Sequence, residues 1–83
     1  MNSIIFILKY GGVPVDVNVD TEEHIIGTIF PVNINGSYRF TLFMNEEEDW
    51  MVMRESDGKV PVVEDDLLRS IVKKMHNVWY NAA

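Results

Sequence analysis

Three pairs of turn-forming residues constrain the fold of this chain more than any other feature. Each pair stands between runs that are rich in valine, isoleucine and aromatic residues: Gly11-Gly12, Asn35-Gly36 and Asp57-Gly58. A two-residue turn of type I′ needs positive φ at both central positions, which glycine and asparagine tolerate. The pairs therefore predict β-hairpins that join consecutive antiparallel strands.

The first pair sets the register of the first hairpin. A two-residue turn at Gly11-Gly12 places the residues on either side of it opposite each other, and alternate positions then share a face. On one face every cross-strand pair is apolar, whereas polar residues such as Asp16 and Asn18 stand on the other face. We predict that the apolar pairs face the core: Tyr10 with Val13, Leu8 with Val15, Phe6 with Val17, and Ile4 with Val19.

The Asn35-Gly36 turn joins residues 24–34 with residues 37–44. Pairing across this turn predicts two apolar faces, and Pro31 predicts a bulge or an interrupted ladder because proline has no backbone N–H. One helix cannot cover both faces of such a hairpin, so we expect one of them to form an interface. The first face carries Ile29, Phe40, Leu42 and Met44, and the second carries Ile26, Phe30, Val32 and Phe43.

The third pair predicts the weakest hairpin. Asp57-Gly58 stands between residues 50–55 and 59–63, whose cross-strand pairs mix charged with apolar side chains. Pro61 interrupts the second arm, so we expect only a short edge strand there.

After Val63 the apolar residues repeat with the period of a helix. We predict an amphipathic helix from about Asp65 to Tyr80, with acidic residues at its start and Lys73 and Lys74 in later turns, as the helix dipole favours. Its apolar stripe consists of Leu67, Leu68, Ile71, Val72, Met75, Val78 and Trp79.

Together these elements predict one α+β domain over residues 1–83: an antiparallel meander of five or six strands with a C-terminal helix packed on one face. A length of 83 residues, of which 47% are hydrophobic, suits a single core. A strongly curled, barrel-like sheet with the helix as a plug is the alternative architecture.

Two acidic segments are expected at the end of the sheet opposite the glycine turns, because connections in a meander alternate between its two ends. Carboxylate oxygens suit hard divalent cations, and histidine is a common metal ligand. These residues are therefore candidates for a metal site, and the alternative is solvated loop charge that also opposes aggregation. They are Glu22, Glu23, His24, Glu46, Glu47, Glu48 and Asp49, with Asp20 preceding the first segment.

Composition narrows the function classes. A net charge of -6 disfavours nucleic acids and anionic membranes as partners, and the absence of cysteine fits a cytoplasmic protein without requiring that location. Residues 4–8 are too short an apolar run for a signal peptide or a membrane span. No nucleophile elbow or phosphate-binding loop is present, so the sequence indicates no cofactor and favours a non-enzymatic protein.

The leading hypothesis is therefore a protein-interaction module that self-associates as a homodimer through an apolar face of the sheet. The expected interface residues are Ile26, Phe30, Val32, Phe43 and, on the exposed side of the helix, Tyr80. The first alternative is divalent-cation binding or metal-assisted chemistry at the acidic segments. The second is an acidic inhibitor or nucleic-acid mimic that binds a basic partner.

Overall fold

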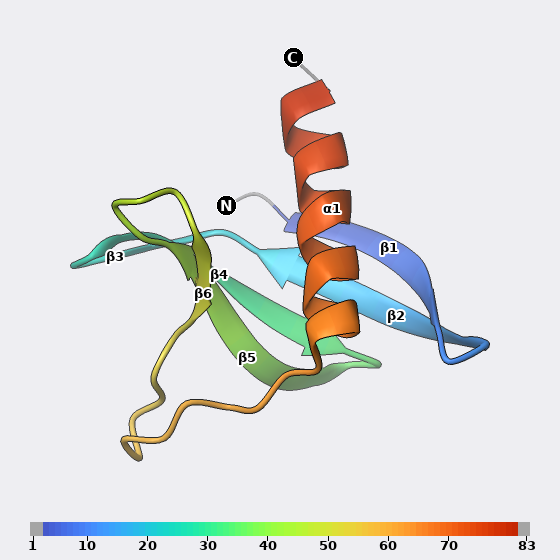
Figure 1. Cartoon of the computed structure of the whole chain (residues 1–83), viewed down its shortest axis with the longest axis horizontal. Helices are drawn as coiled ribbons and strands as arrows, with labels where there is room; N and C mark the ends of the chain where they lie inside the picture. Colours follow the sequence, from blue (N-terminus) through green and yellow to red (C-terminus); the bar gives the residue numbers. More distant parts are fainter. Residues whose placement is uncertain (1–2, 82–83) are drawn as a thin grey trace.

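The computed structural model describes residues 3–81, with side chains described as far as residue 78. An antiparallel sheet of six strands lies against a C-terminal helix (Figure 1), which confirms the predicted fold class. Along the sheet the strands follow the order β1-β2-β4-β5-β6, and β3 pairs with β4. Their bounds are β1 Ser3–Tyr10, β2 Val13–Asp20, β3 Glu22–His24, β4 Gly27–Ile34, β5 Ser37–Met44 and β6 Trp50–Val52, and the helix α1 is Asp65–Asn81.

The β1–β2 hairpin has the predicted register. Gly11 and Gly12 have φ of 62° and 80°, the positive values that their two-residue turn requires. All four predicted apolar pairs form, from Tyr10 with Val13 at the turn to Ile4 with Val19 at the open end, although Val13 is exposed rather than part of the core. The turn alone was sufficient to predict this register, because no bulge shifts the pairing of the two strands.

The β4–β5 hairpin contains the irregularity that Pro31 predicts, located between Val32 and Asn33. Asn33 pairs with Tyr38, whereas Val32 pairs with Phe40. Arg39 is therefore the extra residue of a β-bulge, and the register beyond it is shifted by one position.

This shift corrects the predicted division of the hairpin into two faces. Val32 and Phe30 pair with Phe40 and Leu42, so all four side chains point towards α1. Phe43 instead pairs with Ile29 on the other side of the sheet. The prediction that Phe30, Val32 and Phe43 share one face is wrong, because an ideal two-residue register does not include the bulge.

A second difference lies at the start of β4. The chain reverses at Ile25-Ile26, between paired His24 and Gly27, so the predicted strand over residues 24–34 is in fact the end of one hairpin arm and the whole of the next. Gly27 has φ of 124°, which explains why glycine stands directly after this turn.

The Asp57-Gly58 pair does form a turn, in which the Glu55 N–H donates to the Lys59 carbonyl at 2.8 Å. Its arms do not form a ladder, because β6 ends at Val52 and residues 59–63 are not a strand. Figure 1 also shows this turn well away from the other two glycine turns, so the prediction that all three share one end is wrong.

Helix α1 covers one side of the sheet, which we call the inner face. Ile71 and Met75 are 0% exposed, and Leu67, Leu68 and Val72 pack around them. His76 ties the later turns of α1 to β6, because its Nε2 accepts a hydrogen bond from Trp50 Nε1 at 3.1 Å. In the predicted apolar stripe, Val78 is exposed and Trp79 lies outside the described side chains, whereas the other five members pack against the sheet.

We expect Ile71→Ala to lower the free energy of unfolding by about 2–5 kcal/mol, because it leaves a cavity at the centre of the contact between α1 and the sheet. Urea denaturation measures this change. The matched control is Lys73→Ala on the exposed side of α1, which should stay within about 0.5 kcal/mol of the parent. Equal effects of the two substitutions would contradict this packing.

Candidate interaction surface

The two acidic segments lie at one end of the sheet, as predicted. Glu22 pairs with Ile29 of β4, and Ile29 pairs with Phe43 of β5, which leads directly into the connection between β5 and β6. The first segment is a strand rather than a loop. All seven candidate side chains, Glu22, Glu23, His24, Glu46, Glu47, Glu48 and Asp49, are exposed.

Local hydrogen bonds explain how the second acidic segment folds. Asn45 Oδ1 accepts hydrogen bonds from the backbone N–H groups of Glu47 at 3.0 Å and Asp49 at 2.9 Å. Asparagine commonly organises turns in this way. Glu48 has φ of 64°, a value that residues other than glycine rarely adopt.

In the first acidic segment, Glu23 accepts a hydrogen bond from Thr28 Oγ1 at 3.2 Å. His24 Nδ1 accepts one from the Ile26 N–H at 3.4 Å. Among the residues that the structure describes, no three acidic or histidine side chains gather into a group that could hold a metal ion. The metal site therefore stays a sequence prediction, without a ligand set that the fold brings together.

The predicted interface residues are separated by the fold. Val32 is 0% exposed beneath α1, and Phe30 packs edge-to-face against Trp50 with ring centroids 5.2 Å apart. Phe43 is half-buried on the opposite side of the sheet. Only Ile26 is largely exposed, at the tip of the β3–β4 hairpin, and the side chain of Tyr80 lies outside the described residues.

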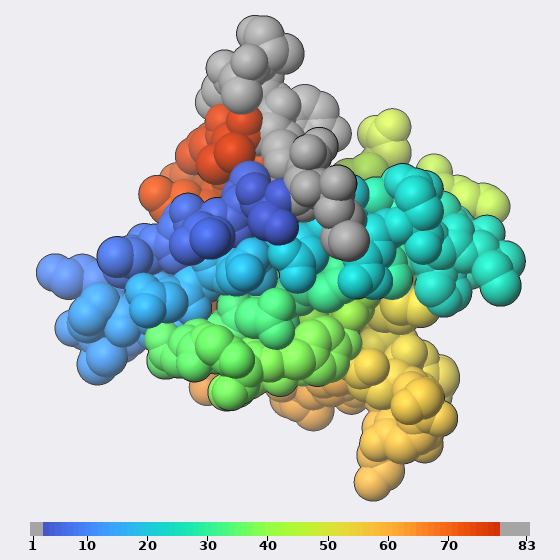
Figure 2. All heavy atoms as spheres, turned by 180° about the vertical axis from the view of Figure 1, so that it is seen from behind, coloured from blue at the N-terminus to red at the C-terminus, as the bar shows by residue number. Residues whose placement is uncertain are grey.

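Among the described residues, no helix covers the side of the sheet opposite α1, which we call the open face (Figure 2). Two large apolar residues on this face are exposed, Ile5 at 76% and Ile7 at 67%. Both belong to β1, which pairs only with β2 and therefore forms one edge of the described sheet. The central part of the open face consists of Ile5, Ile7, Asp16, Asn18 and Asn33.

A hollow of about 390 Å³ lies on the open face, beside β1. Ile5, Asn18 and Asn33 contribute to its wall. Asn18 Oδ1 is buried there and has no hydrogen-bond partner among the described residues. Buried acceptors are normally satisfied, so this one favours a surface that is completed by a partner or by water.

Sequence reasoning did not select Ile5 and Ile7, although it placed them on the polar face of the first hairpin. The signal was available, because two isoleucines alternate with core residues on a strand whose neighbour carries Asp16 and Asn18. Ile25 was also missed. It is 99% exposed at the β3–β4 turn, and this turn has no glycine or asparagine at its centre.

Tyr38 forms the other polar contact network of the open face. Its hydroxyl oxygen lies 2.7 Å from Thr41 Oγ1, and the hydroxyl donates a hydrogen bond to the Glu55 carboxylate. Partial burial raises the pKa of Tyr38 above 10.0, and the hydrogen bond to Glu55 raises this pKa further. Through the hydrogen bond between Tyr38 and Glu55, this network connects the segment that follows β6 to strand β5.

A raised pKa in the folded state means that ionisation of Tyr38 opposes folding. The contribution of neutral Tyr38 to the free energy of unfolding should therefore be fully present below pH 10. It should be lost as the pH rises from there through the pKa of Tyr38 in the folded state. We expect Glu55→Gln to lower the pKa of Tyr38 in a spectrophotometric titration, because it removes a neighbouring negative charge. An unchanged titration curve in this variant would contradict the contact.

Comparisons with protein-family models, curated proteins and solved structures give no match for this chain. The fold and the surface chemistry are therefore the basis for a functional proposal. In the part of the chain that the structure describes, no helix is long and apolar enough to cross a bilayer.

Proposed function

We propose that this protein is a non-enzymatic interaction module that self-associates by pairing β1 with β1 of a second copy. The observation that supports the proposal is an eight-residue edge strand, whose outer side pairs with no other strand that the structure describes, with two highly exposed isoleucines. Proteins usually protect such edges with charges, prolines or covering segments, because an unpaired strand readily pairs with another. The edge of β1 has no proline and carries one charged residue, Lys9.

Hydrogen-bond geometry identifies the backbone groups that are available at this edge. In a hairpin closed by a two-residue turn, the residues next to the turn form a hydrogen-bonded pair, and such pairs then recur at every second position. Tyr10, Leu8, Phe6 and Ile4 therefore bond to β2. The N–H and C=O groups of the alternate residues point to the free edge: Ser3, Ile5, Ile7 and Lys9.

These residues are self-complementary when two β1 strands run antiparallel. A two-fold axis at Phe6 pairs Ser3 with Lys9 of the second copy and Ile5 with Ile7, so every outward backbone group finds a partner. Four isoleucine side chains then meet on the open faces of the two sheets. Burying them favours this register over the neighbouring ones, which leave backbone groups unpaired.

Charge supports the same register. Ser3 Oγ donates a hydrogen bond to Asp20 at 2.6 Å, so a carboxylate lies one strand away from Ser3. Pairing of Ser3 with Lys9 brings the lysine of the second copy next to this pair of side chains. At each end of the interface, the positive charge of Lys9 in one copy then lies near the negative charge of Asp20 in the other, which is an attractive contact.

The position of α1 is compatible with this arrangement. The helix packs on β1 and then extends beyond it (Figure 1), so its later turns would pass over the inner face of the second copy. Val78 is exposed on this overhanging part. Contact with the partner's sheet would give Val78 the apolar cover that its own sheet does not provide.

The test uses charge exchange at the two isoleucines. Because Ile5 faces Ile7 across the two-fold axis, I5K/I7K and I5E/I7E should each lose self-association by at least about tenfold. A mixture of the two variants should restore a heterodimer, since opposite charges then face each other. Analytical ultracentrifugation over the micromolar range measures all three samples.

The matched control is I25K/I26K at the tip of the β3–β4 hairpin, which removes equally apolar residues from another exposed site. This variant should associate like the parent. A parent protein that remains monomeric, or a hairpin-tip variant that loses association while I5K/I7K keeps it, would refute pairing through β1.

A further inference from the structure

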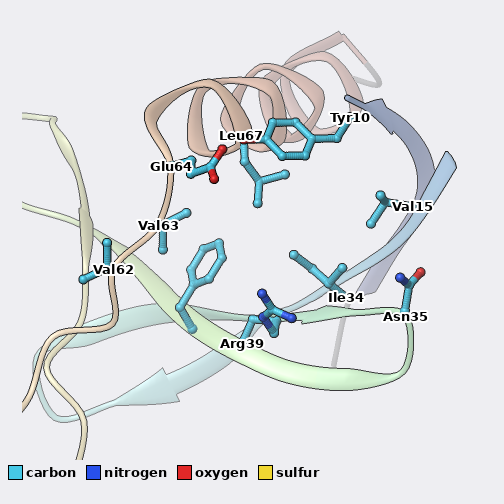
Figure 3. Close-up of a pocket in the computed structure, with 10 residues that line it drawn as sticks. Tyr10, Val15, Ile34, Asn35, Arg39, Val62, Val63, Glu64 and Leu67 are labelled. Atoms are coloured by element: carbon cyan, nitrogen blue, oxygen red, sulfur yellow. The ribbon is translucent and has the colours of Figure 1, made fainter. Parts of the chain in front are cut away.

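A cavity of about 310 Å³ lies on the inner face, near the start of α1 (Figure 3). Its walls combine apolar and polar surface and come from the sheet, from α1 and from the segment that precedes the helix. Its volume falls within the range of small-molecule sites, which are typically apolar clefts with a few polar groups. The lining residues are Tyr10, Val15, Ile34, Asn35, Arg39, Phe40, Val62, Val63, Glu64 and Leu67.

The β-bulge directs Arg39 into this cavity. Successive residues of a regular strand point to opposite faces, yet Arg39 and Phe40 both line the same space. Arg39 is the unpaired residue of the bulge, and bulges commonly redirect a side chain beside a functional site. In Figure 3 the Arg39 side chain leaves β5 and points toward the cavity, where it stays exposed to solvent.

The Arg39 side chain forms no hydrogen bond or ion pair with the residues that the structure describes. The guanidinium therefore keeps its donors for a ligand or for water. Its planar donors match a carboxylate, with two parallel hydrogen bonds. The surrounding valine, isoleucine, phenylalanine and leucine side chains match an apolar ligand body.

The geometry points to a binding site for a small monocarboxylate with an apolar body. Arg39 binds the carboxylate, and Phe40, Ile34 and Leu67 contact the rest of the molecule. Glu64, on the opposite wall, disfavours ligands with a second negative charge, such as phosphate monoesters. The site is on the other side of the sheet from the proposed dimer contact at Ile5 and Ile7, and it does not depend on self-association.

Titration of the ¹⁵N-labelled protein with octanoate tests the proposal, with octanol as the uncharged comparator. Octanoate should shift the backbone amide signals of Arg39, Phe40 and Leu67, and octanol should bind at least about tenfold more weakly. R39Q should weaken octanoate binding by at least about tenfold, because it removes the charge that holds the carboxylate. E64Q should strengthen binding, because it removes the repelling charge.

R69Q is the matched control, since it removes one positive charge from an exposed position of α1 outside the cavity. It should bind octanoate like the parent. Thermal unfolding followed by circular dichroism verifies that R39Q is folded, as expected for a side chain without partners. Absence of octanoate-induced shifts at millimolar concentration, equal binding of octanol, or equal effects of R39Q and R69Q would each overturn the site.

Discussion

The packing of α1 against the inner face is the interaction on which the other features depend. Ile71 and Met75 are fully buried among residues from β1, β2, β4 and β5, and they join the strands into one core. One helix covers one side of this sheet, so the open face is left without a layer of its own. The same asymmetry leaves Ile5 and Ile7 exposed on β1, which is an edge strand because it pairs only with β2.

The β-bulge at Arg39, opposite Val32 and Asn33, determines which residues of β5 pack in the core and which line the cavity. By shifting the register of β5, it puts Phe40 and Leu42 on the same side of the sheet as Val32 and Phe30, which faces α1. It also places Arg39 beside Phe40 at the cavity wall. One extra residue in β5 therefore both aligns the core residues and places an exposed positive charge at the wall of the cavity.

Local patterns predicted the β1–β2 register, the bounds of α1 and its buried residues Ile71 and Met75. They did not locate the bulge, since a register shift depends on how β4 packs between two neighbouring strands. The turn at Ile25-Ile26 was missed because its conformation depends on Gly27 after the turn. The candidate surface was misplaced for the same reason: both Val32 and Ile5 are apolar, and only the tertiary fold determines which one is covered.

Amide hydrogen exchange in β1, measured at several protein concentrations, tests the central claim of edge pairing most directly. The amides of Ile5, Ile7 and Lys9 point to the free edge, whereas those of Phe6 and Leu8 bond to β2. Pairing through β1 predicts that exchange of the first group slows as concentration rises, in step with dimer formation. Rapid exchange of Ile5 and Ile7 that does not change with concentration would contradict it.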